Sequence, residues 1–316
     1  MRSGAGLLER SHLGRLLLTG ADRRAYLQGL LTNDIEALTP GTGCYAALLN
    51  ARGRMISDMR VLELGNAVLL DVPAALAEAV RAHLDRFVFS EDVQVRDVTG
   101  ERAELGLYGP AAATVASTVL HPTIDLSSLP FYGSAVVRHG DHDVLVVGSD
   151  EPGVTGFDFI VEAAAESSLA DALRAAGAVD VGREAANAVR VEAGRPRFGE
   201  DMDEETIPLE AGIEDRAISR TKGCYVGQEV IVRVLDRGQG RVARHLVGLE
   251  LTSSVEAGAA IAAGDRDIGK ITSVARSPAL ERWIALGYVH RDHASEGTAV
   301  TVAGTPASVR RLPFVE

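Results

Sequence analysis

Two kinds of hydrophobic pattern follow one another along this chain, and together they limit its possible folds. Up to about residue 240, stretches with the two-residue period of strands alternate with stretches that have the spacing of helices. Residues 44–72 predict three strands joined by turns, and residues 73–87 predict a helix with a proline at its permitted early position. After residue 240 only short strand patterns separated by glycine-containing turns remain. We therefore expect an α+β region followed by a small β-barrel.

The composition narrows the class of protein. The 316 residues are 46% apolar, which is enough for two or three domains with their own cores. There are 32 basic and 44 acidic residues, and a net charge of −12 argues against a broad nucleic-acid surface. We find no secretory signal and no apolar run long enough to cross a bilayer. These features predict a cytoplasmic protein with no nucleic-acid partner and no membrane partner.

The chain has only two cysteines, Cys44 and Cys224, which rules out a disulfide framework or a cysteine cluster for a metal. Two His-x-x-His pairs, 139/142 and 290/293, lack further ligands at zinc spacing, so we predict no metal site. Cys44 precedes an apolar strand and is expected to be an unreactive core residue.

Cys224 stands in a different setting, the sequence KGCYVGQE at residues 222–229. Arg220 and Lys222 precede it, and their positive charge would favour the thiolate form. Gly223 and Gly227 suggest a sharp bend or a close backbone approach. The residues themselves leave two interpretations open, a reactive thiol and a buried structural cysteine.

Several stretches together resemble one protein family. They are YLQGLLTNDI (26–35), YAALLNARGRMISD (45–58), TGFDF (155–159), VRVEAGRPRFGEDMDEETIPLEAG (189–212) and, above all, KGCYVGQE. They are similar to the folate-binding YgfZ branch of the GcvT-like superfamily, whose relatives include the glycine-cleavage T-protein. The likeness runs from about residue 13 to the C-terminus.

This resemblance implies an α+β fold, with a GcvT-like ring of two folate-binding subdomains interleaved within residues 1–240 and a C-terminal β-barrel over residues 241–316. It implies binding of tetrahydrofolate or a one-carbon derivative, with iron–sulfur client or assembly proteins as partners and a transient iron–sulfur cluster as a further cofactor. The implied role is iron–sulfur cluster assembly or repair, with Cys224 as the working residue. Lys222 is its catalytic companion, and the other motif residues are Gly223, Tyr225, Gly227, Gln228 and Glu229.

The resemblance also assigns folate-site residues. Asp158 lies on a strand between Phe157 and Phe159, so the carboxylate and the two aromatic rings should point to opposite faces. A carboxylate can accept the paired N–H donors of a pterin ring in two parallel hydrogen bonds. Asn33, Asp58 and Arg190 are further cofactor-binding candidates, carried over by position alone.

Two other functions remain open. A folate-dependent aminomethyltransferase shares the fold, but T-proteins have an Asp-Asp pair where this chain has Ser57-Asp58, and an Arg-Asp pair where it has Ala186-Asn187. We therefore expect no appreciable aminomethyl transfer. The other alternative is a folate-binding scaffold without chemistry. For Cys224 itself, the roles of nucleophile, cluster ligand and redox switch all remain open.

Overall fold

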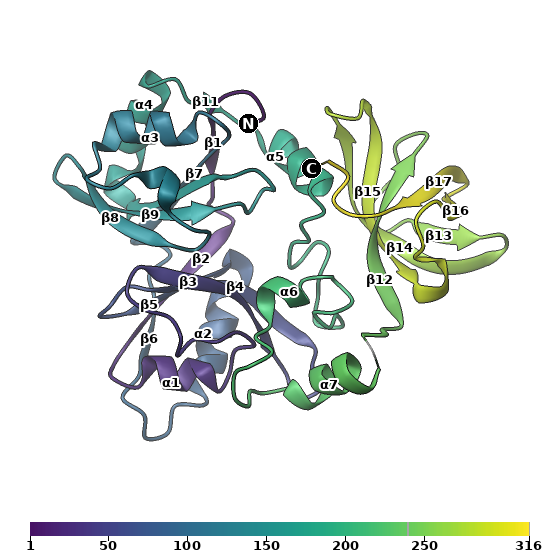
Figure 1. The fold of residues 1–316 in the computed structure, drawn as a ribbon, viewed down its shortest axis with the longest axis horizontal. Coiled ribbons are helices and arrows are strands. Elements are labelled where there is room, and N and C mark those ends of the chain that lie inside the picture. Colours follow the sequence, from purple (N-terminus) through teal and green to yellow (C-terminus); the bar gives the residue numbers. More distant parts are fainter. Residues whose placement is uncertain (239, 316) are drawn as a thin grey trace.

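The computed structural model describes residues 1–238 and 240–315 and contains three sheet-based units (Figure 1). Two of them are open sheets with helices, and the third is a closed barrel. The two open sheets lie one above the other in Figure 1, with the barrel beside them. This confirms the predicted mixed α+β fold with a C-terminal β-barrel.

The first unit is a six-stranded sheet in the order β11-β1-β7-β10-β9-β8. All its neighbouring strands are antiparallel except β1 and β11. Phe157 and Phe159 lie on the face that packs against its helices, and Asp158 therefore points to the other face, as the strand alternation predicted. The elements are β1 (Gly6–Glu9), β7 (Arg102–Tyr108), α3 (Ala112–Leu120), η2 (Leu126–Ser128), β8 (Ser134–His139), β9 (His142–Ser149), β10 (Gly156–Glu162), η3 (Ala163–Ala165), α4 (Glu166–Ala175) and β11 (Val179–Asp180).

The second unit is a five-stranded sheet in the order β3-β4-β5-β2-β6. Helices α1 and α2 cover one face, and their apolar side chains share a core with Leu16, Leu48 and Val61. The expected helix over 73–87 forms as a short 3-10 turn followed by α2. The elements are β2 (Leu13–Thr19), α1 (Arg23–Gln28), β3 (Thr42–Leu49), β4 (Met55–Glu63), β5 (Val68–Pro73), η1 (Ala74–Leu76), α2 (Ala77–Asp85) and β6 (Gln94–Asp97).

The first two units are interleaved along the chain, because β1 belongs to the six-stranded sheet while β2 to β6 build the other sheet before β7 returns. A long segment then leads to the barrel through α5 (Arg183–Glu192), α6 (Glu214–Ala217), α7 (Gln228–Val232) and η4 (Arg233–Arg237). Helix α5 packs its Ala188 and Val191 against Ile284 and Leu286 of the barrel. None of the helices in the described residues is both long and apolar enough to span a bilayer.

The barrel closes in the order β12-β15-β14-β13-β16-β17. Short β-branched and aliphatic side chains, among them Val247, Ile261 and Val302, fill its interior. Its elements are β12 (Arg244–Leu251), β13 (Ala260–Ala263), β14 (Arg266–Ser277), β15 (Arg282–His290), η5 (Arg291–His293), β16 (Ala299–Val302) and β17 (Thr305–Arg310).

A buried ion cluster joins the two open sheets on the faces that their helices leave uncovered. Arg60 of β4 pairs with Asp71 of its own sheet and, across the sheet interface, with Glu104 at 2.7 Å and with Asp158. All four side chains are at most 4% exposed. Small apolar contacts surround the cluster, including Leu62 against the partner sheet. The two sheets are thus fixed to each other by charge as well as by packing.

Arg60 should therefore be essential for stability. In Arg60→Met the carboxylates around it lose their main partner, and breaking a buried ion pair from one side costs about 3–5 kcal/mol of unfolding free energy. Arg81→Met is the control, because Arg81 pairs with Glu78 on the solvent face of α2, where water screens the charges. Chemical denaturation should show a large loss for the first variant and almost none for the second. Equal stability of the two variants would contradict the role given to the cluster.

Candidate functional site

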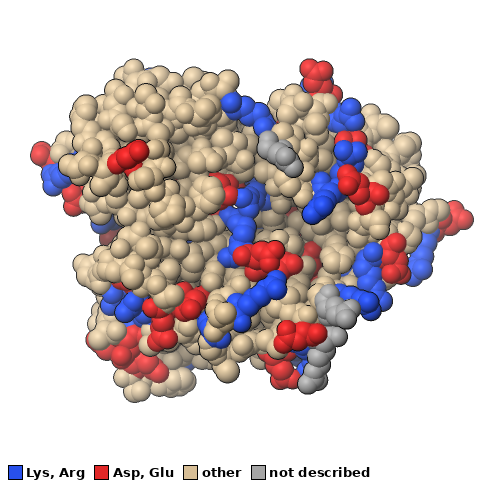
Figure 2. Space-filling model, viewed as in Figure 1, with Lys and Arg blue, Asp and Glu red and all other residues tan. Residues whose placement is uncertain are grey.

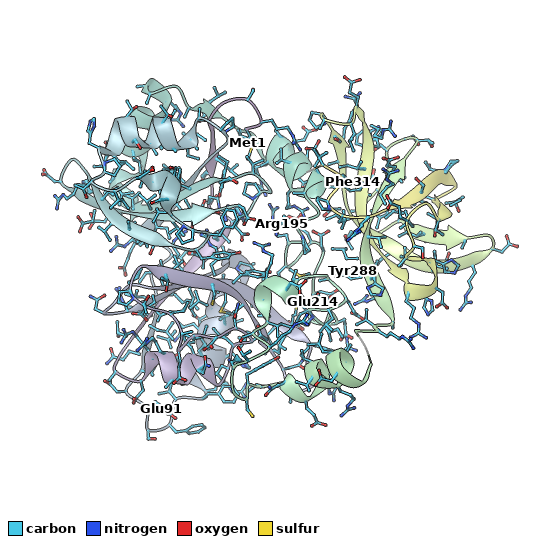
Figure 3. The ribbon with its side chains drawn as sticks, in the orientation of Figure 1. Met1, Glu91, Arg195, Glu214, Tyr288 and Phe314 are labelled. Atoms are coloured by element: carbon cyan, nitrogen blue, oxygen red, sulfur yellow. The ribbon has the colours of Figure 1, made fainter. Side chains whose placement is uncertain are left out.

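Charged side chains gather in a hollow where the three units meet (Figure 2). Arg195 lies in the middle of this region in Figure 3. We call the group the central site and define it by the residues that contact one another there: Tyr45, Asp58, Tyr132, Asp150, Glu151, Arg195 and Arg216.

Strand register explains why Asp58 belongs to the central site and Ser57 does not. In the β3–β4 pair, Leu48 is opposite Ser57 and Ala47 is opposite Asp58, so the two neighbours of β4 point to opposite faces. Leu48 belongs to the core beneath the helices, and Ser57 is fully buried on that same face. Asp58 shares the other face with Tyr45. The carboxylate that this strand presents to the central site is therefore Asp58.

Asp58 is partly buried, and its carboxylate has one side-chain partner among the described residues. The Tyr45 hydroxyl donates a hydrogen bond to Oδ2 at 2.7 Å. Burial raises the pKa of Asp58 to about 6, and the nearby Glu151 charge acts in the same direction, whereas the Tyr45 hydrogen bond and Arg216 act against it. Near neutral pH this carboxyl group is therefore able to exchange a proton.

Arg216 of α6 contacts four other residues of the central site. Its guanidinium donates to the Tyr132 hydroxyl at 2.6 Å and lies 3.3 Å from Asp150 and 3.4 Å from Glu151. It also stands over the ring of Tyr45, 5.2 Å from the ring centre. Asp150 is shared with Arg195, which follows α5. Two cations and three carboxylates thus gather, partly buried, between the sheets and the segment leading to the barrel.

Asp158, the residue predicted to bind the pterin ring, is buried and already has protein partners on both carboxylate oxygens. It is fully buried, the Tyr108 hydroxyl donates to one oxygen, and Arg60 pairs with the other. Burial would raise the pKa of Asp158, but Arg10, Arg60 and the Tyr108 hydrogen bond outweigh it and hold that pKa below the ordinary value. A pterin contact with Asp158 would require one of these partners to move, and it stays a prediction.

Asn33 and Arg190 lie behind the central site and support it. Asn33 donates from Nδ2 to the backbone carbonyls of Tyr45 at 2.8 Å and Arg216 at 3.0 Å, and so ties β3 to α6. Arg190 is buried, donates to the Arg195 carbonyl at 2.8 Å and to Ser273 of the barrel at 2.8 Å, and pairs with Asp201. Both side chains have these protein partners, so direct folate contacts by them also stay predictions.

Ala186 stands where T-proteins have an arginine, and its surroundings in this structure are apolar. It is 6% exposed and packs with Leu8 and Tyr108 in a small apolar cluster. Its methyl group supplies no charge, and the cation that lies 3.6 Å from the Asp158 carboxylate is Arg10.

Most residues of the KGCYVGQE motif fix the loop that contains them to the rest of the protein. The Lys222 ammonium donates to the backbone carbonyls of Gln28 at 2.6 Å and Asn33 at 3.1 Å, at the end of α1. Burial lowers the pKa of Lys222 to about 8. Gly227 has a φ of +83°, and a Cβ there would lie 2.5 Å from the Asn50 carbonyl oxygen. The loop is therefore fastened at both ends to the five-stranded unit.

Of the remaining motif residues, some also hold the loop in place and others lie on the surface. Tyr225 is buried beside Lys222, and Gln228 accepts a hydrogen bond from the Tyr225 amide at 3.3 Å. Glu229 pairs with Arg233 on the surface, and no atom would crowd a Cβ at Gly223. Cys224 alone presents an exposed thiol. The loop leaves the centre at α6 and passes α1 on its way to α7 (Figure 1).

The cations expected beside Cys224 have other partners. Lys222 is engaged by the carbonyls near α1, and Arg220 pairs with Asp215 at 3.1 Å. The Lys222 charge acts instead on Cys44, where burial nevertheless raises the pKa of the thiol to about 12. Cys44 thus has the environment of an unreactive thiol, as expected.

Sequence reasoning missed most of the central site, namely Tyr45, Tyr132, Asp150, Glu151, Arg195 and Arg216. These residues come from β3, the segment before β8, the β9–β10 loop, the segment after α5, and α6. The one available signal was the acidic pair in the SDEP turn, 149–152, just before the TGFDF strand.

The raised pKa of Asp58 predicts a pH-dependent stability effect. An unfolded aspartate titrates near 4 and the folded one at about 6, so the stability that Asp58 contributes is complete below about pH 4 and is lost as pH rises through about 6. Asp58→Asn should therefore gain stability relative to the unmodified protein between pH 4 and 7, by about 1–3 kcal/mol. Denaturation curves across this range measure the difference.

Ser57→Ala is the matched control, since it alters the neighbouring residue without removing a titratable group. Its stability difference from the unmodified protein should not vary over the same pH range. A difference for Asp58→Asn that stays flat, or that falls as pH rises, would contradict the environment described for Asp58.

Known proteins share both this fold and its order along the chain. Residues 1–222 match the GCVT N-terminal domain, and residues 244–316 match the glycine cleavage T-protein C-terminal barrel domain. An aminomethyltransferase of Rubrobacter xylanophilus is 34% identical over 99% of this chain and 83% of its own length. One from Synechocystis is 32% identical over 96% of this chain and 82% of its own length.

A solved structure agrees with these matches. The glycine cleavage system aminomethyltransferase T of Bartonella henselae superimposes with a TM-score of 0.89 and 28% identity, covering 100% of this chain and 87% of that one. These relatives carry the aminomethyltransferase name, and placement in the YgfZ branch stays a prediction. The chain belongs to the GCVT family, with the N-terminal domain and the C-terminal barrel domain of the glycine cleavage T-protein.

Proposed function

We propose that this protein binds tetrahydrofolate, or a one-carbon derivative of it, in the central site. Asp58 supports this assignment, because Tyr45 holds Oδ2 and no other side chain among the described residues donates to the carboxylate. A carboxylate beside aromatic rings suits a flat pterin ring with adjacent N–H donors. Family membership supports the same ligand.

We further propose that the protein supports iron–sulfur enzymes and that Cys224 is its working residue. One observation carries this proposal: Lys222, Tyr225, Gly227 and Gln228 all hold the motif loop in place, and Cys224 is left exposed on it. A packing cysteine would be buried. A rigid loop that presents a thiol to solvent suits a residue that meets a partner protein, either as a nucleophile, as a ligand to a cluster in transit or as a redox switch.

Aminomethyl transfer to tetrahydrofolate is the second candidate, and the comparisons favour it. The relatives at 32–34% identity are named aminomethyltransferases. Asp58 adds support, because the carboxylate facing the central site is present even though residue 57 is serine. Against this activity stands Ala186, which supplies no cation where T-proteins have arginine.

The folate proposal predicts a specific loss of binding. Asp58→Ala should weaken anaerobic tetrahydrofolate binding about 10-fold or more, because a hydrogen bond to a charged group contributes about 1.5–3 kcal/mol. Ser57→Ala, whose side chain faces the helix-covered core, should bind like the unmodified protein. Titration calorimetry measures both. Unchanged affinity in Asp58→Ala would move the pterin contact away from this residue.

The two candidate activities separate on Cys224. If the protein supports iron–sulfur enzymes, the unmodified protein should restore the activity of these enzymes in a strain from which its gene has been deleted. Cys224→Ser should fail to restore that activity, and Cys44→Ser should restore it. Both variants should bind folate like the unmodified protein. An aminomethyltransferase should instead turn over an aminomethyl-lipoyl carrier with tetrahydrofolate at ordinary enzyme rates, about 1 s⁻¹ or faster.

Peptide-resolved alkylation with iodoacetamide provides the structural control, since the exposed Cys224 should react much faster than the half-buried Cys44. Full rescue by Cys224→Ser would refute the role of the thiol, and turnover at enzyme rates would establish the second candidate.

A further inference from the structure

The loop between α2 and β6, which we call the anchor loop (residues 86–92), presents two phenylalanines to solvent. Phe89 is 83% exposed and Phe87 is 37% exposed. Phe89 is the most exposed large apolar residue that the structure describes. A single apolar side chain on a surface is ordinary, whereas two aromatic rings on one short loop form the kind of surface that anchors a partner protein.

Hydrogen bonds hold the anchor loop in one backbone conformation. The Glu91 carboxylate accepts from the Phe89 amide at 2.8 Å. Asp22, directly before α1, accepts from the Asp92 amide at 2.8 Å, and Asp92 accepts from the Ala21 amide at 2.9 Å. The backbone that carries Phe89 is therefore ordered before any partner arrives, which lowers the entropy cost of binding.

The same loop concentrates negative charge. Residues 85–92, DRFVFSED, contain three acidic residues and one arginine. The carboxylates of Asp22, Glu91 and Asp92 bind backbone amides, and within the described part of the chain none of the three forms an ion pair. Carboxylates without cations beside exposed aromatic rings favour a partner with positive charge.

Helix α1 connects the anchor loop with the loop of the KGCYVGQE motif. Asp22 binds the anchor loop before α1, and the Gly29 carbonyl accepts from the Val226 amide of the motif loop at 3.2 Å after it. Phe89 and Cys224 are thus exposed on loops fastened to the two ends of one helix, which is about 9 Å long. A standard interface covers about 800 Å² on each partner, which is enough to include both loops.

The figures place this surface away from the central site. Glu91 lies at the lower edge of the molecule in Figure 3, whereas Arg195 lies in its middle. The motif loop passes along the same lower edge beside α1 (Figure 1). Ala25 and Gly29 on the exposed side of α1 are small, so that a partner can approach closely between the two loops.

We propose that the anchor loop docks a partner protein that has an apolar pocket bordered by lysine or arginine, with Phe89 inserted in that pocket. A partner held there lies across α1 and reaches the Cys224 thiol. That this partner is an iron–sulfur protein rests on the proposed function, whereas the docking surface itself rests on the exposed rings and the charges around them.

Other occupants suit these charges less well. A second copy of the chain bound through the same face would bring like carboxylates together. A lipid surface with anionic headgroups would repel them. Nucleic acid would be repelled for the same reason.

Photocrosslinking in cells followed by binding measurements tests the proposal. Phe89→benzoylphenylalanine should form an adduct with a different protein, and Val136→benzoylphenylalanine should not, although Val136 is 64% exposed on β8. The captured protein is identified by mass spectrometry, purified and titrated with the full chain. Phe89→Ser should weaken binding about 10-fold or more, as expected for an anchor residue, and Phe89→Leu should weaken it less. Val136→Ser should bind like the unmodified protein.

The charge of the partner has its own test. Asp22→Asn combined with Asp92→Asn keeps the oxygen acceptors of the loop and removes two negative charges. This variant should bind the captured protein more weakly and with less dependence on salt. An adduct only with a second copy, no protein adduct, Phe89-dependent binding to phosphatidylglycerol vesicles, or unchanged affinity in Phe89→Ser or in the double variant would overturn the proposal.

Rescue of the deletion strain separates this inference from the proposed function. If the unmodified protein does not restore iron–sulfur enzymes, yet the Phe89-dependent complex forms, the docking surface stands and the proposed function is refuted. If the unmodified protein restores them and Phe89→Ser does so equally well, the docking surface is refuted and the proposed function stands. The melting temperature of Phe89→Ser should equal that of the unmodified protein, because Phe89 is exposed.

Discussion

The ion pairs of Arg60 across the sheet interface are the constraint on which the rest of the structure depends. One guanidinium joins β4 to carboxylates on β7 and β10, so the five-stranded and six-stranded sheets take one relative position. The cluster leaves Nε of Arg60 and Oδ1 of Asp71 without a partner among the described residues. A buried ion cluster adds little net stability over an apolar one, but removal of a single partner is costly because charges are left buried and unpaired.

That fixed position places the central site. Asp58 lies on the same face of β4 as Arg60, two residues away, and Glu151 follows β9, the strand next to edge strand β8 of the other sheet. Arg216 can contact both Glu151 and Tyr45, the partner of Asp58, only because the sheets are held face to face. A substitution in the ion cluster is therefore expected to disturb the central site even where no ligand touches the cluster. Asp158 belongs to the cluster, which makes it a structural neighbour of the site as well as a candidate contact.

The sequence predicted local structure well and spatial relations poorly. Strand alternation correctly predicted that Asp158 lies on the other face of the sheet from Phe157 and Phe159, because that pattern depends only on the backbone. The same rule shows that Ser57 and Asp58 diverge, and the pairing of Ser57 with the core residue Leu48 decides which of them faces the helices. At the level of sequence Asp58 is a folate-site candidate by position alone, and the strand register supplies the reason why Asp58, and not Ser57, faces the central site.

The partners of the charged side chains were harder still to predict from the sequence. Lys222 is two residues from Cys224 in sequence, yet its ammonium reaches the carbonyls at the end of α1, and Arg216 meets Tyr45 and Tyr132 across large sequence separations. Nothing in the local sequence encodes such contacts, because they depend on how α6 and the motif loop pack on the five-stranded unit. The exposure of Cys224 likewise follows from that packing.

A crystal structure of the protein with bound tetrahydrofolate, grown without oxygen, tests the central claim most directly. The account predicts the pterin ring in the central site, with a donor of the ring bonded to Oδ1 of Asp58 and with the Arg60–Asp158 pair intact. A ligand bound outside the central site, or a pterin bonded to Asp158 with Arg60 displaced and Asp58 untouched, would contradict it.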